Sequence, residues 1–140
     1  MLDFIRIACA VPAVRVGDTA KNAEDICAYI EKADGERADI VLFPELALTG
    51  YSCQDLFFQD TLWTGVQQGI RKIAGYTKNY PNVTAAVGLP VRTGMRLYNC
   101  AAVISRGKIH ALVPKTYIPN YNEFYEKRWF SSGSEVTEDM

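Results

Sequence analysis

Short apolar segments bounded by prolines mark the first half of the chain. The runs 4–11 and 39–43 are rich in β-branched and other apolar residues and stop at Pro12 and Pro44, which is typical of short buried strands. Proline cannot donate to a sheet ladder, so each strand is expected to end before its proline. The pattern therefore predicts two strands, the second of which ends next to Glu45.

The segment between these strands predicts a helix, because its apolar residues recur at helical spacing. Asp18 or Thr19 is the expected N-cap, and Gly35 is the expected C-terminal stop. The stripe expected to face the core consists of Ala20, Ala23, Cys27, Ile30 and Ala33, whereas the residues mostly outside it are Lys21, Asn22, Asp25, Glu31 and Lys32. The order strand, helix, strand favours a parallel pair joined by a right-handed crossover.

A loop rich in aromatic and small residues follows at 46–58. A second helix is predicted from about Asp60 to Asn79, and the residues expected to face inward are Leu62, Val66, Ile70 and Ile73. Three glycines weaken this prediction, since each costs ~1 kcal/mol relative to alanine in a helix interior: Gly65, Gly69 and Gly75.

Three further strands are predicted in the second half. Residues 83–89 form a third buried run that is closed by Pro90. Residues 97–104 and 108–113 favour a hairpin joined through 105–107. The hairpin would add antiparallel neighbours to an otherwise α/β plan.

Composition and charge exclude several classes of protein. With 140 residues, 49% hydrophobic and 22% charged, the chain is expected to form one domain at most. A net charge of −1 without a Lys/Arg cluster argues against a nucleic-acid partner. No apolar run is long enough to span a bilayer, and the N-terminal residues do not form a signal peptide. We therefore expect a cytoplasmic protein whose four cysteines are reduced thiols.

Two charged residues follow prolines at predicted strand ends. Glu45 follows Pro44, and Lys115 follows Pro114. Acid–base residues and ligands commonly lie at the C-terminal strand edge of α/β sheets. A carboxylate that accepts a proton from a nucleophile and an ammonium that stabilises negative charge are two parts of an acyl-transfer site. Taken alone, each residue is equally typical of a solvated surface.

The segment 115–126 contains one lysine, two glutamates and three tyrosines without helical or strand periodicity. Such an aromatic loop is costly to leave in water, so we expect it to fold over a cleft or to cover a core edge. His110 is the only histidine, which removes most histidine-based metal sites and weakens a Ser-His-Asp interpretation. No metal site is expected.

These motifs resemble those of the nitrilase (carbon–nitrogen hydrolase) superfamily. The matching residues are Phe43-Pro44-Glu45-Leu46 with Thr49-Gly50-Tyr51, then Pro114-Lys115 with Glu123 eight residues on. More narrowly, the stretches 44–57 and 114–130 are similar to the glutamine-hydrolysing domains of glutamine-dependent NAD synthetases. The resemblance covers essentially the whole chain. It implies an α/β fold that is about the N-terminal half of a nitrilase-type α-β-β-α sandwich.

The resemblance also implies roles for single residues. Glu45 matches the general base, Lys115 the lysine that stabilises the tetrahedral intermediate, and Glu123 the second glutamate that supports the catalytic set. Tyr51 and Tyr121 match residues that shape the glutamine pocket. The nucleophile of the family is a cysteine on a strand-to-helix turn well beyond the lysine.

No such cysteine occurs before Met140. Cys53 is the best-placed substitute, but its surroundings do not form a nucleophile elbow. Cys9 and Cys100 lie in predicted strands and Cys27 lies on the helix stripe, where thiols are usually inert. We therefore expect the isolated 140 residues to be inactive.

Residues 1–133 are thus expected to form a partial carbon–nitrogen hydrolase domain, and 134–140 a polar tail or truncation point. The implied substrate is glutamine, and the implied partner is a missing C-terminal synthetase domain that uses ATP and Mg²⁺ to amidate deamido-NAD. This chain has no Gly-rich phosphate loop, so no cofactor is expected here. An exposed strand edge and sheet face would favour a homo-oligomer.

Two other interpretations stay open. One is a stand-alone nitrilase-family amidase that acts on another small amide, although the amino-acid sequence of residues 51–57 favours the synthetase branch. The other is a non-catalytic truncated module, which the missing nucleophile favours.

Overall fold

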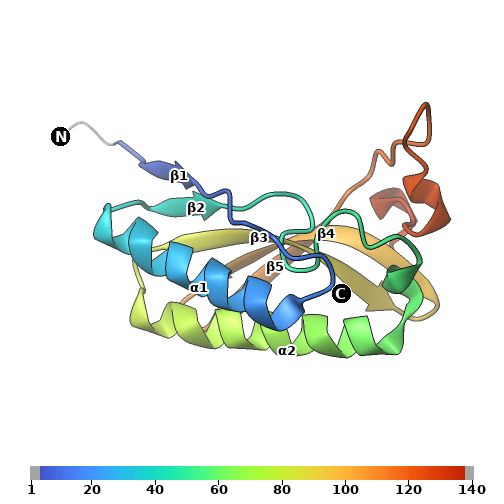
Figure 1. The fold of residues 1–140 in the computed structure, drawn as a ribbon. Helices are drawn as coiled ribbons and strands as arrows, with labels where there is room; N and C mark the ends of the chain where they lie inside the picture. Colours follow the sequence, from blue (N-terminus) through green and yellow to red (C-terminus); the bar gives the residue numbers. More distant parts are fainter. Residues whose placement is uncertain (1–3, 138–140) are drawn as a thin grey trace.

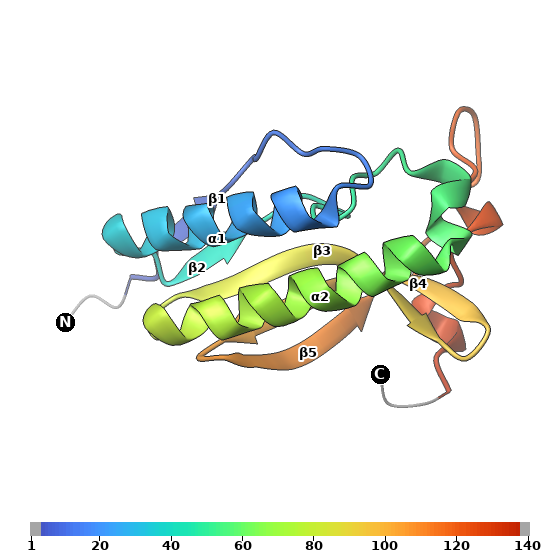
Figure 2. The same cartoon turned by 60° about the horizontal axis from the view of Figure 1, so that its bottom comes forward.

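The computed structural model of the protein describes residues 4–137. Five strands form one sheet in chain order: β1 (Ile7–Cys9), β2 (Ile40–Leu42), β3 (Thr84–Thr93), β4 (Arg96–Ser105) and β5 (Lys108–Pro114). Two long helices, α1 (Thr19–Gly35) and α2 (Asp60–Tyr76), lie on one face of this sheet (Figure 1 and Figure 2). The predicted α/β class is confirmed.

Some sequence-based predictions fall outside the described residues. The expected absence of a signal peptide rests partly on residues 1–3, and the predicted polar tail includes residues 138–140; both ranges lie outside the described residues. Across the predicted boundary, Gly133–Glu135 form a short 3-10 turn with a capping box between Ser132 and Glu135. The boundary at residue 133 stays a prediction.

The direction of the strands changes at β3. The pairs β1–β2 and β2–β3 are parallel, with α1 and α2 as the crossover helices, and β3–β4 and β4–β5 are antiparallel. The predicted parallel pair and the predicted hairpin are both confirmed. β1 is shorter than the predicted strand 4–11, because its ladder with β2 extends over three residue pairs.

Helix α1 begins as predicted. The carboxylate of the N-cap Asp18 accepts a hydrogen bond from the backbone N–H of Lys21 at 3.0 Å, which satisfies one of the free donors of the first turn. Gly35 is the last helical residue, but the left-handed residue that turns the chain is Arg37, with φ 58°.

Four of the five residues in the predicted stripe of α1 are buried: Ala23, Cys27, Ile30 and Ala33. Ala20 is exposed, whereas Ile26 is fully buried. Asn22, expected outside the stripe, is also buried, because its amide donates to the backbone oxygens of Arg15 at 2.7 Å and Leu48 at 3.1 Å. A buried amide with both partners satisfied is tolerated in a core, and polarity alone does not reveal such partners.

Helix α2 forms despite its glycines, and its predicted inward residues are buried: Leu62, Val66, Ile70 and Ile73. A Cβ atom at Gly65 would collide with Oγ1 of Thr19, and one at Gly69 would lie 3.0 Å from Cδ1 of Leu48. These two glycines allow α2 to approach its neighbours closely. The predicted helical end at 77–79 is a 3-10 turn.

The prediction that Pro90 closes the third strand is wrong. β3 continues through Pro90 to Thr93, and Pro90 pairs with Asn99 of β4. The ladder between β2 and β3 ends at Leu42↔Ala86. Beyond that point one edge of β3 has no strand partner within residues 4–137, so a residue without an N–H is tolerated there.

The two faces of the sheet differ in burial. The main core lies between the helices and the sheet and includes Val41, Ala85 and Ile104. On the opposite face, the register aligns one row across all five strands: Cys9, Leu42, Ala86, Val103 and Ala111. This row is apolar but open, with Leu42 40% exposed and Cys9 and Ala111 exposed. A sheet face is thus left uncovered by the described residues.

A second, smaller cluster lies beneath the loops at the C-terminal ends of β2 and β5. It is composed of Leu46, Cys53, Phe57, Leu62, Leu97 and Phe130. Among the residues that the structure describes, no helix is long and apolar enough to cross a membrane.

Candidate active site

The sheet topology brings Glu45 and Lys115 to the same edge. β2 runs parallel to β3, and β5 regains that direction after two antiparallel steps. The C-terminal ends of β2 and β5 therefore lie on one side of the sheet, and Pro44 and Pro114 mark these ends. The strands between them, β3 and β4, place Gly88 and Asn99 beside Glu45 and Lys115.

The turn that presents Glu45 rests on Gly88 of β3. Leu46 adopts a left-handed φ of 53°, and the N–H of Leu48 donates to the carbonyl oxygen of Gly88 at 3.1 Å. A Cβ atom on Gly88 would lie 2.5 Å from the carbonyl oxygen of Pro44 and 2.9 Å from the carbonyl carbon of Glu45. Only a glycine allows this close approach, so Gly88 fixes the height of the carboxylate above the sheet.

Glu45 and Lys115 form an ion pair. Nζ of Lys115 lies 2.7 Å from Oε1 of Glu45, and their side chains are 30% and 42% exposed, respectively. The same Oε1 accepts a hydrogen bond from Nδ2 of the buried Asn99. The carboxylate is therefore held by one charged donor and one neutral donor.

A second carboxylate, Glu126, holds Lys115 from the other side. Its Oε2 lies 3.2 Å from Nζ of Lys115, and its side chain is only 4% exposed. Its Oε1 accepts a hydrogen bond from the hydroxyl of Tyr51. Both oxygens of this buried carboxylate are therefore paired, as a buried charge requires.

The charges around Lys115 keep it protonated. Burial alone would lower the pKa of Lys115, but the hydrogen bonds and negative charges of Glu45 and Glu126 outweigh it and raise the pKa above its ordinary value. Burial, the hydrogen bond to Glu126 and the nearby carboxylates raise the pKa of Tyr51. Lys115 is therefore a permanent cation at neutral pH, and Tyr51 a neutral donor.

The two predicted substrate-binding tyrosines, Tyr51 and Tyr121, have different surroundings. Tyr51 contacts Glu126, whereas Tyr121 is 64% exposed and packs edge-on against Phe124.

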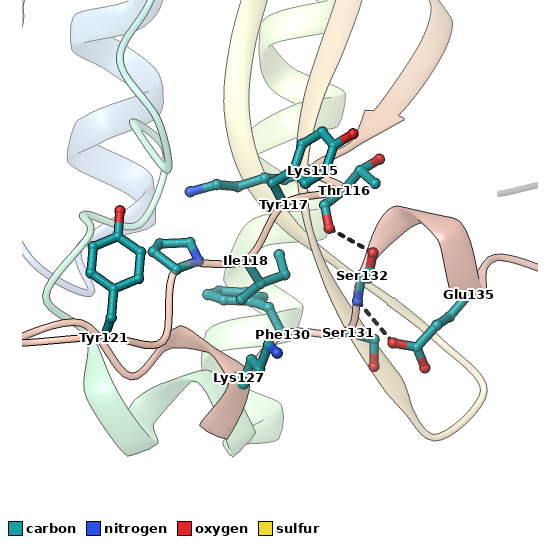
Figure 3. A pocket seen from close by; sticks show the side chains of 11 residues that line it. Lys115, Thr116, Tyr117, Ile118, Tyr121, Lys127, Phe130, Ser131, Ser132 and Glu135 are labelled. Atoms are coloured by element: carbon teal, nitrogen blue, oxygen red, sulfur yellow. Dashed lines mark hydrogen bonds between the residues drawn. The ribbon is translucent and has the colours of Figure 1, made fainter.

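Tyr121 and Lys115 line one end of a cavity of about 790 Å³, and Ser132 and Glu135 line the other end (Figure 3). A smaller hollow of about 300 Å³ lies directly beside the ion pair and is lined by Glu45, Gly88, Asn99 and Lys115, among others. Both cavities have a size that suits a small molecule.

The predicted second glutamate, Glu123, does not join the ion-pair network. Its side chain is exposed, and no hydrogen bond or ion pair joins it to another residue in 4–137. Its charge still contributes to the raised pKa of Tyr51, so it lies near the site. Its role in the catalytic set stays a prediction.

An external clamp joins the two loops that carry the site. The guanidinium of Arg128 donates to both carboxylate oxygens of Asp55 at 2.8 Å, and Nε1 of Trp129 donates to Oδ1 at 3.0 Å. The hydrogen bonds from Arg128 and then Trp129 hold the pKa of Asp55 well below its ordinary value. The clamp thus ties the loop 46–58 to the segment that contains Glu126.

None of the three buried cysteines is an activated thiol. Burial raises the pKa of Cys27 to about 11 and that of Cys100 to about 12. Burial also raises the pKa of Cys53, whose thiol donates to the backbone oxygen of Thr49 at 3.1 Å. Cys9 is exposed on the open face of the sheet.

Within residues 4–137, no three His, Cys, Asp or Glu side chains could jointly hold a metal ion, and the absence of a metal stays a prediction.

Sequence reasoning missed two residues of this network. Asn99 is a polar residue inside an apolar strand, which is a signal of a specific partner. Glu126 stands three residues after Glu123 in the same motif, and only the burial of its side chain distinguishes it from Glu123.

The chain is similar to several known proteins. The carbon–nitrogen hydrolase family model matches residues 6–139. The glutamine-dependent NAD(+) synthetase of Mycobacterium tuberculosis (strain H37Rv) is 36% identical over 130 residues, and that of Xylella fastidiosa (strain 9a5c) is 41% identical over 131. Each alignment covers 93% of this chain but 19% and 24% of the relatives, so the chain spans about a fifth to a quarter of their length.

Solved structures show the same fold. The glutamine-dependent NAD+ synthetase from Acinetobacter baumannii superposes with a TM-score of 0.84 at 27% identity, over 92% of this chain and 24% of that one. The Nesterenkonia AN1 amidase from the nitrilase superfamily gives a TM-score of 0.80 at 22% identity, over 92% and 48%. At this lower identity the likeness shows the fold alone, and the predicted nitrilase-type fold is confirmed.

Proposed function

Since the chain belongs to the carbon–nitrogen hydrolase family, we propose that it is the N-terminal part of a domain that hydrolyses the side-chain amide of glutamine. The observation that carries this proposal is the ion pair between Glu45 and Lys115, at 2.7 Å beside an open hollow. The relatives that are 36% and 41% identical are named for their dependence on glutamine, which supports this substrate.

The residues have complementary tasks in this reaction. Glu45 accepts the proton of a cysteine thiol as the sulfur attacks the amide carbon of glutamine. Lys115 stabilises the oxyanion of the tetrahedral intermediate, because it is protonated and lies next to the base. Glu45 then passes its proton to the leaving ammonia. It finally activates the water that cleaves the thioester and releases glutamate.

The nucleophile is the part that these residues do not supply. Cys27, Cys53 and Cys100 are buried thiols with raised pKa values, and a thiol rather than a thiolate is a poor nucleophile. We therefore propose that the cysteine comes from sequence after Met140 and that residues 1–140 alone do not hydrolyse glutamine.

In the complete protein, the ammonia would be used for amidation of deamido-NAD by a synthetase domain that binds ATP and Mg²⁺. The open apolar face of the sheet supports a further layer or subunit against it, because exposed apolar patches of this kind mark interaction surfaces. A cytoplasmic homo-oligomer is part of this proposal.

The test compares glutamate release by purified residues 1–140 with that by the longer protein that contains them. We expect release by the longer protein only. Release by the short chain that Glu45→Gln abolishes would overturn the proposed inactivity. No release by the longer protein would instead favour a non-catalytic module, and hydrolysis of another small amide would favour a stand-alone amidase.

A further inference from the structure

We propose that Asn99 is a positioning residue that holds Oε1 of Glu45, so that Oε2 is the oxygen that exchanges the proton during amide hydrolysis. This inference rests on the proposed function. It concerns a residue that makes no ion pair and that lies 54 positions after Glu45 in the chain.

Asn99 bridges the base and the lysine. Its side-chain Nδ2 donates to Oε1 of Glu45, and its backbone carbonyl oxygen accepts the N–H of Lys115 at 2.7 Å. Asn99 is 3% exposed and lies within β4, between β3 and β5, opposite Pro90 of β3. One rigid strand position thus sets the place of both catalytic groups.

The two oxygens of Glu45 are not equivalent. Oε1 accepts from both Asn99 and Lys115, whereas no donor from residues 4–137 contacts Oε2. The Glu45 side chain is 42% exposed, so it has room to leave the site when its anchor is lost. Two donors on one oxygen fix the carboxylate plane and leave the other oxygen free for proton transfer.

A neutral amide suits this task better than a second cation. An asparagine side chain does not titrate at physiological pH, so it orients Glu45 without competing for the proton that Glu45 carries. It donates through its NH₂ group, so a leucine of similar shape would remove the donor without adding a charge next to Glu45. The Asn99→Leu variant therefore separates the donor from the packing.

The kinetic test uses the longer protein with Asn99→Ala and Asn99→Leu. Both variants should lower kcat for glutamate release by about 10- to 100-fold, as expected for a lost hydrogen bond to a charged group, with KM changed less than about threefold. Thr77→Val is the matched control, because Thr77 is also fully buried and hydrogen-bonded but lies near the β4–β5 turn, where it contacts Gly107. A fall in kcat no larger than that of Thr77→Val would overturn the inference.

A second readout does not depend on the reaction. The Lys115 ammonium is titrated by NMR in the wild type and in Asn99→Ala. If Asn99 holds Glu45 against Lys115, its loss should lower the pKa of Lys115 towards the ordinary 10.5. An unchanged pKa would contradict the inference even in an active enzyme. A lowered pKa in a protein without glutaminase activity would support the positioning role while the proposed function fails.

Discussion

The ammonium nitrogen of Lys115 lies 2.7 Å from Oε1 of Glu45, although 70 residues separate them in the chain. The contact arises from topology, since β2 and β5 run in the same direction and end at the same sheet edge. Buried Glu126 and Asn99 hold the pair from either side. The geometry brings the proposed base and the proposed oxyanion-stabilising cation into contact.

Glu126, rather than Glu123, should be the second carboxylate that matters for the rate. Glu126→Gln removes a buried negative charge from Lys115 and should lower kcat of the longer protein by about 10- to 100-fold. Glu123→Gln, at an exposed side chain, should change kcat by less than about threefold. Steady-state glutamate release measures both. A large loss in Glu123→Gln with little change in Glu126→Gln would instead support the role that the family resemblance implies for Glu123.

Gly88→Ala should displace the base. The added methyl group would meet the backbone of Pro44 and Glu45, and a shift of about 1 Å in a catalytic group can cost about 100-fold in rate. Gly35→Ala is the control, because nothing lies within 4 Å of a Cβ there. Glutamate release should fall in the first variant only, and equal activity of the two variants would show that the turn accommodates a Cβ.

The glycines of α2 should respond in opposite ways to alanine. Gly75→Ala meets nothing within 4 Å and should stabilise the helix by about 0.5–1 kcal/mol. Gly65→Ala would press on Oγ1 of Thr19 and should destabilise the protein by about 1–3 kcal/mol. Denaturant unfolding of both variants measures the difference. Stabilisation by Gly65→Ala would contradict the close packing of α1 and α2.

The interactions of Asp55 with Arg128 and Trp129 should make the free energy of unfolding depend on pH in the acid range. Arg128 and Trp129 lower the folded-state pKa of Asp55 below the ordinary 3.8, so its contribution is present above that pH and is lost as pH falls towards the folded-state pKa. The Tm difference between the wild type and Asp55→Asn should therefore be larger at neutral pH than at about pH 3. Glu36→Gln is the control, because the Glu36 side chain is exposed and forms no ion pair within residues 4–137. A Tm difference for Asp55→Asn that stays constant with pH would contradict the clamp.

The sequence predicts more of the fold than of the network. Apolar periodicity and prolines located both helices and all five strands, and the repeated Pro-Glu and Pro-Lys pattern indicated the two groups that meet at the site. The sequence-based prediction that β3 ends at Pro90 is wrong. Pro90 is tolerated because no strand pairs with that edge of β3, and the position of neighbouring strands depends on the tertiary structure.

The remaining errors have the same origin. Asn22 is polar but buried because two backbone oxygens satisfy it. Glu123 and Glu126 have the same side chain in the same motif, and only the path of the loop decides which of them contacts Lys115. Partners that are brought together by folding cannot be found from spacing along the chain.

Glu45 is the proposed base of an amide-hydrolysing site. The most direct test measures NAD synthesis by the longer protein with glutamine and with free ammonia as nitrogen donor, in the wild type and in Glu45→Gln. We predict that glutamine-dependent synthesis falls by about 100- to 10,000-fold, while ammonia-dependent synthesis is unchanged. Equal activity of Glu45→Gln with both donors would contradict the claim.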